Sequence, residues 1–199
     1  MEVTTQMIKE LREATQAPML DCRNALVKAE GNFEKAVDVL REQGKAKAAK
    51  REDRDASNGT IEVYAHGGGR VSVIVEVNCE TDFVARSEGF RKFAHTIALQ
   101  IAAGEPKYVT EDQIPQEVYD REAEVARNTA REQGKAEAMF DKIVEGRLKK
   151  FKDEVCLMNQ ALFSDESVTI QQLMNEANIS TGERIVIRRF QRWELGEAL

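Results

Sequence analysis

The sequence predicts an α+β protein: a small three-helix module at the amino end, a charged linker, and a core in which a small antiparallel sheet packs with helices. Two changes of pattern carry this prediction. Apolar side chains recur every three or four residues over residues 1–44, which is the helical period, and then alternate over residues 61–77, which is the strand period. Residues 45–58 are rich in Lys, Ala, Arg and Asp and have no large apolar side chain to bury. We therefore divide the chain into residues 1–44, 45–58 and 59–199.

The amino-terminal module is expected to contain three short helices. Thr4 or Thr5 can cap the first, Pro18 suits the first turn of the second, and Asn32 can cap the third, which Gly44 should end. The expected inward positions, helix by helix, are Met7, Ile8, Leu11 and Ala14; Leu20, Cys22, Ala25, Leu26 and Ala29; and Phe33, Ala36, Val37 and Leu40. Helices this short bury little apolar surface, so the module should be only marginally stable.

The core segment is expected to begin with a β-hairpin. Residues 61–65 and 71–77 alternate around a glycine turn at residues 67–69, with a high β-branched content. A helix should follow from about Ser87 to Gly104, then two helical stretches over residues 116–133 and 135–152, and a short helix over residues 169–178. Residues 184–194 are apolar and β-branched at first, and should add a third strand to the hairpin.

Composition narrows the classes of function. The net charge of -6 and the isoelectric point near 5.2 argue against nucleic-acid binding through bulk electrostatics, which favours a basic surface. Three widely spaced cysteines without a C-x-x-C pair, and only two histidines, suggest neither a disulfide scaffold nor a metal site, so we expect no metal and no cofactor. The start resembles no signal peptide, and no apolar run approaches the roughly 20 residues of a membrane span. We expect a reducing, cytosolic compartment.

One pair of side chains could suggest nucleophilic chemistry. His66 ends one predicted strand and Cys79 ends the next, so the two could be neighbours. The alternative is that Cys79 is a small apolar strand residue and His66 a turn residue, and we favour it because no third orienting group is evident. The glycines at residues 67–69 are followed by no Gly-Lys-Ser/Thr and open no predicted helix, so a hairpin turn explains them better than a phosphate loop.

Residues 78–86 join a predicted strand to a predicted helix and carry an unusual pair. Phe83 and Val84 are apolar in a connection that would normally be polar. Val84 could tuck under the helix. Asp82 and Phe83 together, an acid beside an aromatic ring at a loop tip, suit insertion into a partner protein.

At this segment the chain resembles the elongation factor Ts family. The signature runs through His66-Gly67-Gly68-Gly69-Arg70-Val71 to Asn78-Cys79-Glu80-Thr81-Asp82-Phe83-Val84-Ala85-Arg86. Residues 11–15, 19–22 and 25–26 resemble the family's amino-terminal module, and residues 144–151 and 182–190 resemble its later motifs. The resemblance covers nearly the whole chain. It departs at Gln16-Ala17-Pro18, where the family usually has Gly-Ala-Gly, and at residues 159–164.

The resemblance implies a guanine-nucleotide exchange factor that promotes GDP release from elongation factor Tu during translation elongation. Residues Thr81, Asp82, Phe83 and Val84 match the family segment that wedges between two helices of the GTPase and disturbs its Mg²⁺ site. In that interpretation Phe83 is the apolar wedge, Asp82 reorganises polar groups that support the metal, and Thr81 and Val84 hold the loop in shape. The resemblance also implies a ubiquitin-associated-like (UBA-like) fold for residues 1–44.

Further partner contacts are implied in the same way. Arg12, Met19 and Leu20 match positions through which the amino-terminal module grips the same GTPase domain. The length resembles that of the short form of the family, which is expected to form a homodimer. No enzyme chemistry, direct nucleic-acid contact or membrane contact is implied.

Two alternatives from other classes remain open at this point. A plain adaptor would present Met19 and Leu20 to another partner without accelerating nucleotide release. A cysteine enzyme would depend on Cys79, so that Cys79→Ser would abolish its activity.

Overall fold

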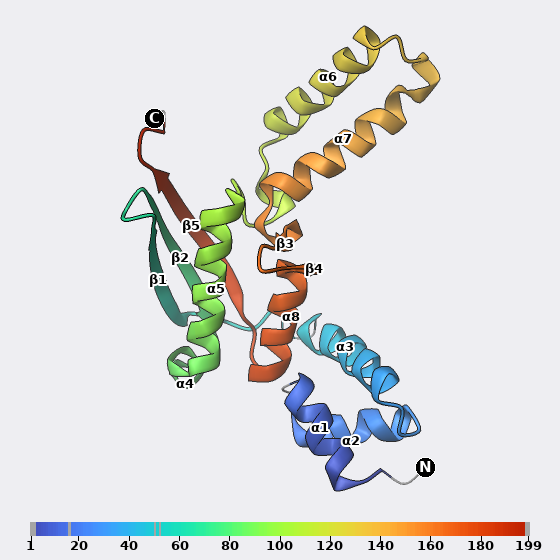
Figure 1. The fold of residues 1–199 in the computed structure, drawn as a ribbon, viewed down its shortest axis with the longest axis vertical. Helices are drawn as coiled ribbons and strands as arrows, with labels where there is room; N and C mark the ends of the chain where they lie inside the picture. Colours follow the sequence, from blue (N-terminus) through green and yellow to red (C-terminus); the bar gives the residue numbers. More distant parts are fainter. Residues whose placement is uncertain (1–2, 16, 50, 52, 198–199) are drawn as a thin grey trace. The chain divides into compact units, whose positions relative to one another are not determined.

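The fold comes from a computed structural model that describes residues 3–15, 17–49, 51 and 53–197 (Figure 1). In chain order the elements are α1 (Thr5–Thr15), α2 (Met19–Lys28), α3 (Phe33–Ala49), β1 (Asn58–His66), β2 (Val71–Cys79), α4 (Asp82–Arg86), α5 (Glu88–Gly104), the 3₁₀ turn η1 (Glu111–Gln113), α6 (Gln116–Glu132), η2 (Glu137–Met139), α7 (Phe140–Val155), η3 (Leu157–Asn159), β3 (Ala161–Leu162), β4 (Asp165–Thr169), α8 (Ile170–Thr181) and β5 (Val186–Glu194). The mixed helix-and-sheet class predicted from the sequence is confirmed.

The chain divides into two compact units, each assembled from separate stretches of sequence. Unit 1 comprises Met1–Glu62, Glu76–His95 and Gln172–Arg188. Unit 2 comprises Val63–Val75, Thr96–Gln171 and Arg189–Leu199. The partner-binding candidates Arg12, Met19, Leu20 and residues 81–84 belong to unit 1, whereas His66 belongs to unit 2.

Helices α1, α2 and α3 pack around one small apolar core within unit 1. Its buried side chains include Leu11, Cys22, Ala25, Leu26, Ala36 and Leu40. Asn32 caps α3 as expected, because its side-chain oxygen accepts a hydrogen bond from the Lys35 amide at 2.9 Å. Thr4 does the same for α1, with its hydroxyl accepting from the Met7 amide at 3.3 Å. The three predicted helices are therefore confirmed.

Three side chains expected to face this core are exposed instead. Leu20 is 65% exposed because, at 100° per residue, it lies on the opposite side of α2 from the buried stripe of Cys22 and Leu26. Phe33 is the first residue of α3 and remains 41% exposed, and Ala14 is exposed near the end of α1.

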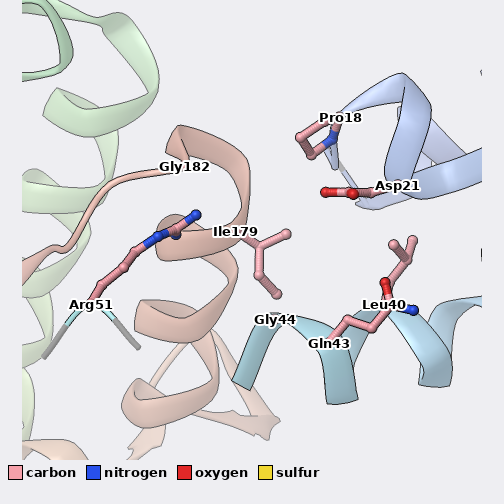
Figure 2. A pocket seen from close by; sticks show the side chains of 8 residues that line it. All are labelled: Pro18, Asp21, Leu40, Gln43, Gly44, Arg51, Ile179 and Gly182. Carbon is pink, nitrogen blue, oxygen red and sulfur yellow. The ribbon is translucent and has the colours of Figure 1, made fainter. Parts of the chain in front are cut away.

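Gly44 does not end the third helix, contrary to the prediction. Helix α3 continues to Ala49, so the first residues of the predicted linker are helical. The glycine serves close packing: a Cβ at Gly44 would lie 2.1 Å from Cδ1 of Ile179 on α8, far inside van der Waals contact. Figure 2 shows the Ile179 side chain pointing from α8 toward Gly44. Close packing against Ile179 therefore explains the glycine at this position. A glycine inside a helix is tolerated at a cost of about 1 kcal/mol relative to alanine.

The predicted hairpin and third strand form one sheet in the order β1-β2-β5. The turn between β1 and β2 uses three glycines with positive φ, of 59°, 68° and 90°, and the amides of Gly69 and Arg70 both donate to the His66 carbonyl. Strand β5 runs antiparallel to β2: the Leu195 amide donates to the Arg70 carbonyl at 2.8 Å, and Arg188 pairs with Glu76 at 3.0 Å. The hairpin turn, and not a phosphate loop, accounts for the glycine run.

Helix α5 follows the sheet and lies across it (Figure 1). Phe90, Phe93 and Ile97 on its inner side are buried, as are Val73, Val75 and Val77 of β2. His95 of α5 joins Glu62 of β1 through its Nδ1 atom, 2.8 Å from Oε1 of the carboxylate. The predicted helix from Ser87 to Gly104 is thus confirmed, but the sequence interpretation missed the short helix α4 before it.

Unit 2 contains an antiparallel helical pair, α6 and α7, that packs through small side chains. Ala123 and Ala126 of α6 meet Val144 and Leu148 of α7. The second helix begins later than predicted because the chain turns at Gly134, which has a φ of 67°, and residues 137–139 form the 3₁₀ segment η2 before α7 starts. A two-stranded antiparallel ribbon, β3 with β4, follows this pair and was not foreseen.

Candidate partner-binding site

The segment after β2 is a tight turn that starts helix α4. Thr81 is the residue that caps this helix: its backbone is extended (φ -124°, ψ 154°) and its hydroxyl accepts a hydrogen bond from the Val84 amide at 3.3 Å. The Ser87 hydroxyl donates to the Val84 carbonyl at 2.8 Å and accepts from the Phe90 amide at 3.3 Å. Ser87 therefore ends α4 and caps α5. We call residues 81–84 the tip loop.

Exposure divides residues 82–85 into an outward and an inward pair. Phe83 is 82% exposed, although it is a large aromatic residue, and Asp82 is also exposed. Val84 and Ala85 are 7% and 9% exposed and belong to the core. The one turn of α4 therefore places Phe83 in solvent while Val84 anchors the backbone behind it, and Val84 tucks under as the sequence allowed.

Asp82 sits beside Phe83 and forms an exposed ion pair with Arg86, one helical turn away. The two side chains are 66% and 73% exposed, so water screens their attraction. Such a pair contributes at most about 1 kcal/mol, and Asp82 can exchange Arg86 for a group on a partner at little cost. The outward side of the tip loop thus presents one acid and one aromatic ring.

The backbone of the tip loop is held by a residue to which the sequence interpretation gave no role. Glu183, just beyond α8, accepts hydrogen bonds from the amides of Glu80 and Thr81, each at 3.1 Å, and from the Thr81 hydroxyl at 2.6 Å. The signal for Glu183 in the sequence was only its place in the 182–190 motif. Its partners lie 102 and 103 residues away along the chain, so spacing could not reveal them.

Three residues of the amino-terminal module were also candidates. Met19 and Leu20, at the start of α2, are 39% and 65% exposed, and Arg12 on α1 is exposed. Of the glycine-free turn between these helices, Gln16 lies outside the described residues, Ala17 is fully buried, and Pro18 precedes α2 with φ -56° and ψ 141°. The Cys22 thiol donates to the Ala17 carbonyl at 3.5 Å, which ties the turn to the module's core.

The pair of Cys79 and His66 is not a catalytic pair. His66 closes β1 at the glycine turn, whereas Cys79 is the last residue of β2, at the other end of that strand. Cys79 is fully buried, its thiol donates to the Thr81 carbonyl at 3.2 Å, and burial raises the pKa of the thiol. A buried thiol with a raised pKa is a poor nucleophile. His66 instead bonds Tyr64, with 2.8 Å between Nδ1 and the phenol oxygen.

Two hollows in the surface are too small for a nucleotide or a typical substrate. The cavity in Figure 2 has a volume of about 40 Å³ and is lined by Pro18, Asp21, Leu40, Gln43, Gly44, Arg51, Ile179 and Gly182. A second hollow of about 240 Å³, in unit 2, lies beside Lys107 and Arg192. Small-molecule sites usually measure roughly 300–1,000 Å³ and are mostly apolar.

Among residues 3–15, 17–49, 51 and 53–197, no three His, Cys, Asp or Glu side chains are grouped so that they could hold a metal ion. None of the described helices is long and apolar enough to span a bilayer.

Comparison with known proteins gives one consistent result. The model of the family described as "Elongation factor TS" matches residues 1–197. The elongation factor Ts of Caldanaerobacter subterraneus subsp. tengcongensis is 52% identical over 197 residues, covering 99% of this chain and 98% of the relative. Those of Syntrophomonas wolfei and Desulfitobacterium hafniense are each 51% identical and cover 99% and 100% of this chain, and 92% and 91% of their own lengths.

Proposed function

Because the chain belongs to the elongation factor Ts family, we propose that it binds elongation factor Tu in its GDP form and promotes the exchange of GDP for GTP during translation elongation. It does so by binding, and not as an enzyme of group transfer or hydrolysis. In this proposal the protein works in the cytoplasm, and residues 1–44 form a UBA-like module joined by the charged segment 45–58 to the core of residues 59–199.

The observation that carries the proposal is the exposure of Phe83. A side chain of this size that is 82% exposed, next to a buried Val84, contributes little to the fold of the isolated protein. Aromatic side chains are, in contrast, among the residues that contribute most to binding when a partner pocket encloses them. The tip loop is therefore better explained as a contact for a partner than as part of the core.

Exchange by this route is a matter of coupled binding. The factor must bind the nucleotide-free GTPase more tightly than the GDP form, and GDP must then weaken the factor by the same ratio. A ratio of about 10⁴ requires roughly 5.5 kcal/mol of differential contact. We propose that Phe83 supplies much of it by wedging between two helices of the GTPase.

We assign the other residues of the tip loop separate roles in exchange. Asp82 releases Arg86 and reorganises the polar groups that support the partner's Mg²⁺ ion, which loosens the hold of the phosphate site on GDP. Thr81 and Val84 keep the loop in shape, through the cap on α4 and through burial. In the module, Arg12, Met19 and Leu20 grip the same GTPase domain, a role supported by their exposure.

We further propose that the protein forms a homodimer. Ile61 and Val63 of β1 are each 62% exposed, and Ile74 of β2 is 38% exposed. Such β-branched side chains usually pack against another surface, and a second copy of the chain would cover them. Sedimentation of the wild-type protein and of Val63→Lys tests this: a monomer at micromolar concentration in both would refute it.

The test of the proposed function is the release of a fluorescent GDP analogue from purified elongation factor Tu. Substoichiometric amounts of this protein should accelerate release, and Asp82→Ala/Phe83→Ala should remove most of the acceleration. No acceleration by a folded wild-type sample would refute the proposal. It would then favour the adaptor alternative, for which the exposed Met19 and Leu20 are the supporting observation.

A further inference from the structure

We propose that Glu183 is the positioning residue of the tip loop: its carboxylate fixes the backbone from which Phe83 projects, and thereby sets the rate of nucleotide exchange without contacting the partner itself. The inference rests on the proposed function for its effect on exchange. The geometry on which it depends lies wholly within unit 1.

The Glu183 carboxylate is used almost fully by the loop. One oxygen, Oε2, accepts from the amides of Glu80 and Thr81, both at 3.1 Å, and the other, Oε1, accepts from the Thr81 hydroxyl at 2.6 Å. Hydrogen bonds to an ionised acceptor are roughly twice as strong as neutral ones. Two of them come from Thr81, the residue that caps α4 two positions before Phe83, and the third comes from Glu80 just before it.

A second carboxylate ties the same two segments together in the opposite direction. Glu80 accepts from the amide of Arg184 at 2.6 Å, and Arg54 contacts it at 3.2 Å. The Glu80 side chain is 19% exposed, so this contact is only partly open to water. Each of two neighbouring chain segments thus holds a backbone amide of the other, which resists sliding as well as separation.

Glu183 can act as a fixed point because its own segment is anchored on both sides. Before it, Gly182 has a φ of 74° and its amide donates to the Asn178 carbonyl at 3.1 Å, which ends α8. After it, the amide of the buried Ile185 donates to the Asn178 side-chain oxygen at 2.7 Å. The carboxylate therefore projects from a segment that the end of α8 already defines.

The consequence for Phe83 follows from the length of α4. A five-residue helix has too few internal hydrogen bonds to set its own direction, so its orientation is determined by how its first turn is held. Without Glu183, two amides and the capping hydroxyl lose their acceptor, and the exposed ring samples more directions. A partner groove then captures it less often.

Substitutions at Glu183 separate the carboxylate's role from a general loss of structure. Glu183→Ala removes all three acceptor contacts. Glu183→Gln can keep its carbonyl toward the two amides while its amide group donates to the Thr81 hydroxyl, so it should preserve most of the arrangement. Glu183→Gln matches the wild-type side chain in size, so it serves as the conservative control for Glu183→Ala, which removes the carboxylate and most of the side chain.

The first experiment reads the loop directly and needs no partner. Amide hydrogen exchange of Glu80 and Thr81 should be about tenfold faster or more in Glu183→Ala, and within about threefold of wild type in Glu183→Gln. The amides of β2 and α5 serve as the internal reference for global opening. Unchanged protection of Glu80 and Thr81 in Glu183→Ala would overturn the inference.

The second experiment tests whether the hydrogen bonds of Glu183 to the tip loop affect the rate of nucleotide exchange. Glu183→Ala should slow release of the fluorescent GDP analogue from elongation factor Tu about tenfold, and Glu183→Gln should restore most of it. In a Phe83→Ala background the same Glu183→Ala change should have little further effect, because the side chain that it positions is gone. Additive losses would overturn the inference. A wild-type protein that does not accelerate release would instead refute the proposed function, and the amide measurement would still decide whether Glu183 holds the loop.

Discussion

Replacing Phe83 by alanine should separate function from stability more clearly than any other single change in the chain. The substitution removes the whole ring and leaves the backbone of α4 able to form, since alanine is a good helix former. Thr81 still caps the helix, and Val84 still lies in the core. The only group removed is one that the isolated fold leaves in water.

The magnitude on the stability side is small. Fully burying a phenylalanine side chain contributes about 1.5–3 kcal/mol, and Phe83 buries about a fifth of its surface. The expected loss in the free energy of unfolding is therefore about 0.5 kcal/mol or less. Urea denaturation of wild type and variant under the same conditions measures it.

The magnitude on the functional side is larger. Truncating an aromatic residue that a partner encloses costs about 2 kcal/mol or more. Converted at 1.36 kcal/mol per tenfold, this is a loss of about 30-fold in the exchange rate at subsaturating factor. The assay is stopped-flow release of the fluorescent GDP analogue from elongation factor Tu.

Phe163→Ala is the matched control, because this ring is 57% exposed in the turn between β3 and β4 and is not part of the tip loop. It should leave both the exchange rate and the stability almost unchanged. The reasoning is refuted if Phe83→Ala exchanges nucleotide as fast as wild type. It is equally refuted if the two phenylalanine variants lose exchange activity to the same extent.

Three further outcomes are expected. Gly44→Ala should destabilise the protein by about 1–3 kcal/mol because its methyl group would overlap Ile179. In an Ile179→Ala background the same change should instead stabilise the protein by up to about 1 kcal/mol, because alanine is the better helix former. Chemical denaturation of wild type, the two single variants and the double variant checks this reversal of sign. Leu20→Ala should weaken binding to elongation factor Tu severalfold in a titration, with the free energy of unfolding within about 0.5 kcal/mol of wild type, since Leu20 is 65% exposed. Burial raises the pKa of the thiols of Cys22, Cys79 and Cys156, so these thiols should resist alkylation at neutral pH. Above the ordinary pKa of 9.0 the unfolded chain loses thiol protons that the folded chain keeps, so the free energy of unfolding should fall as pH rises. Urea unfolding at pH 7.5 and pH 10 would measure this fall.

Local signals in the sequence were sufficient where a segment's structure depends on its own pattern. The alternating valines of β2 and the apolar stripe of α5 define a strand and a helix whatever surrounds them, and both were predicted. The exposure of Phe83 was foreseen for a related reason: an aromatic residue in a short polar connection has few positions near it in the chain that could cover it.

The prediction failed where a residue's role depends on a neighbour distant in the chain. Gly44 has the local signature of a helix stop, and only the position of Ile179 explains why the helix passes through it. The ribbon of β3 and β4 is too short to produce a periodic pattern. Glu183 belongs to the same class, because a glutamate after a helix has no local feature that distinguishes a backbone clamp from a solvated charge.

The tip loop depends both on a local sequence signal, the exposed Phe83, and on a contact with a distant residue, Glu183. An exposed aromatic ring can be read from the sequence, but a ring on a mobile loop would bind weakly, since fixing the backbone of each residue costs about 1–2 kcal/mol. If the four residues of the loop had to be ordered on binding, roughly 4–8 kcal/mol would be lost, about as much as the 5.5 kcal/mol that a 10⁴-fold coupling requires. The hydrogen bonds from Thr81 and Glu80 to Glu183 order the loop during folding, before a partner binds. The entropy cost of that ordering is then offset by burial of side chains such as Val84 and Ile185. If Phe83 acts as the proposed wedge, it therefore also needs Glu183, because the proposed partner contact depends on the backbone that Glu183 holds.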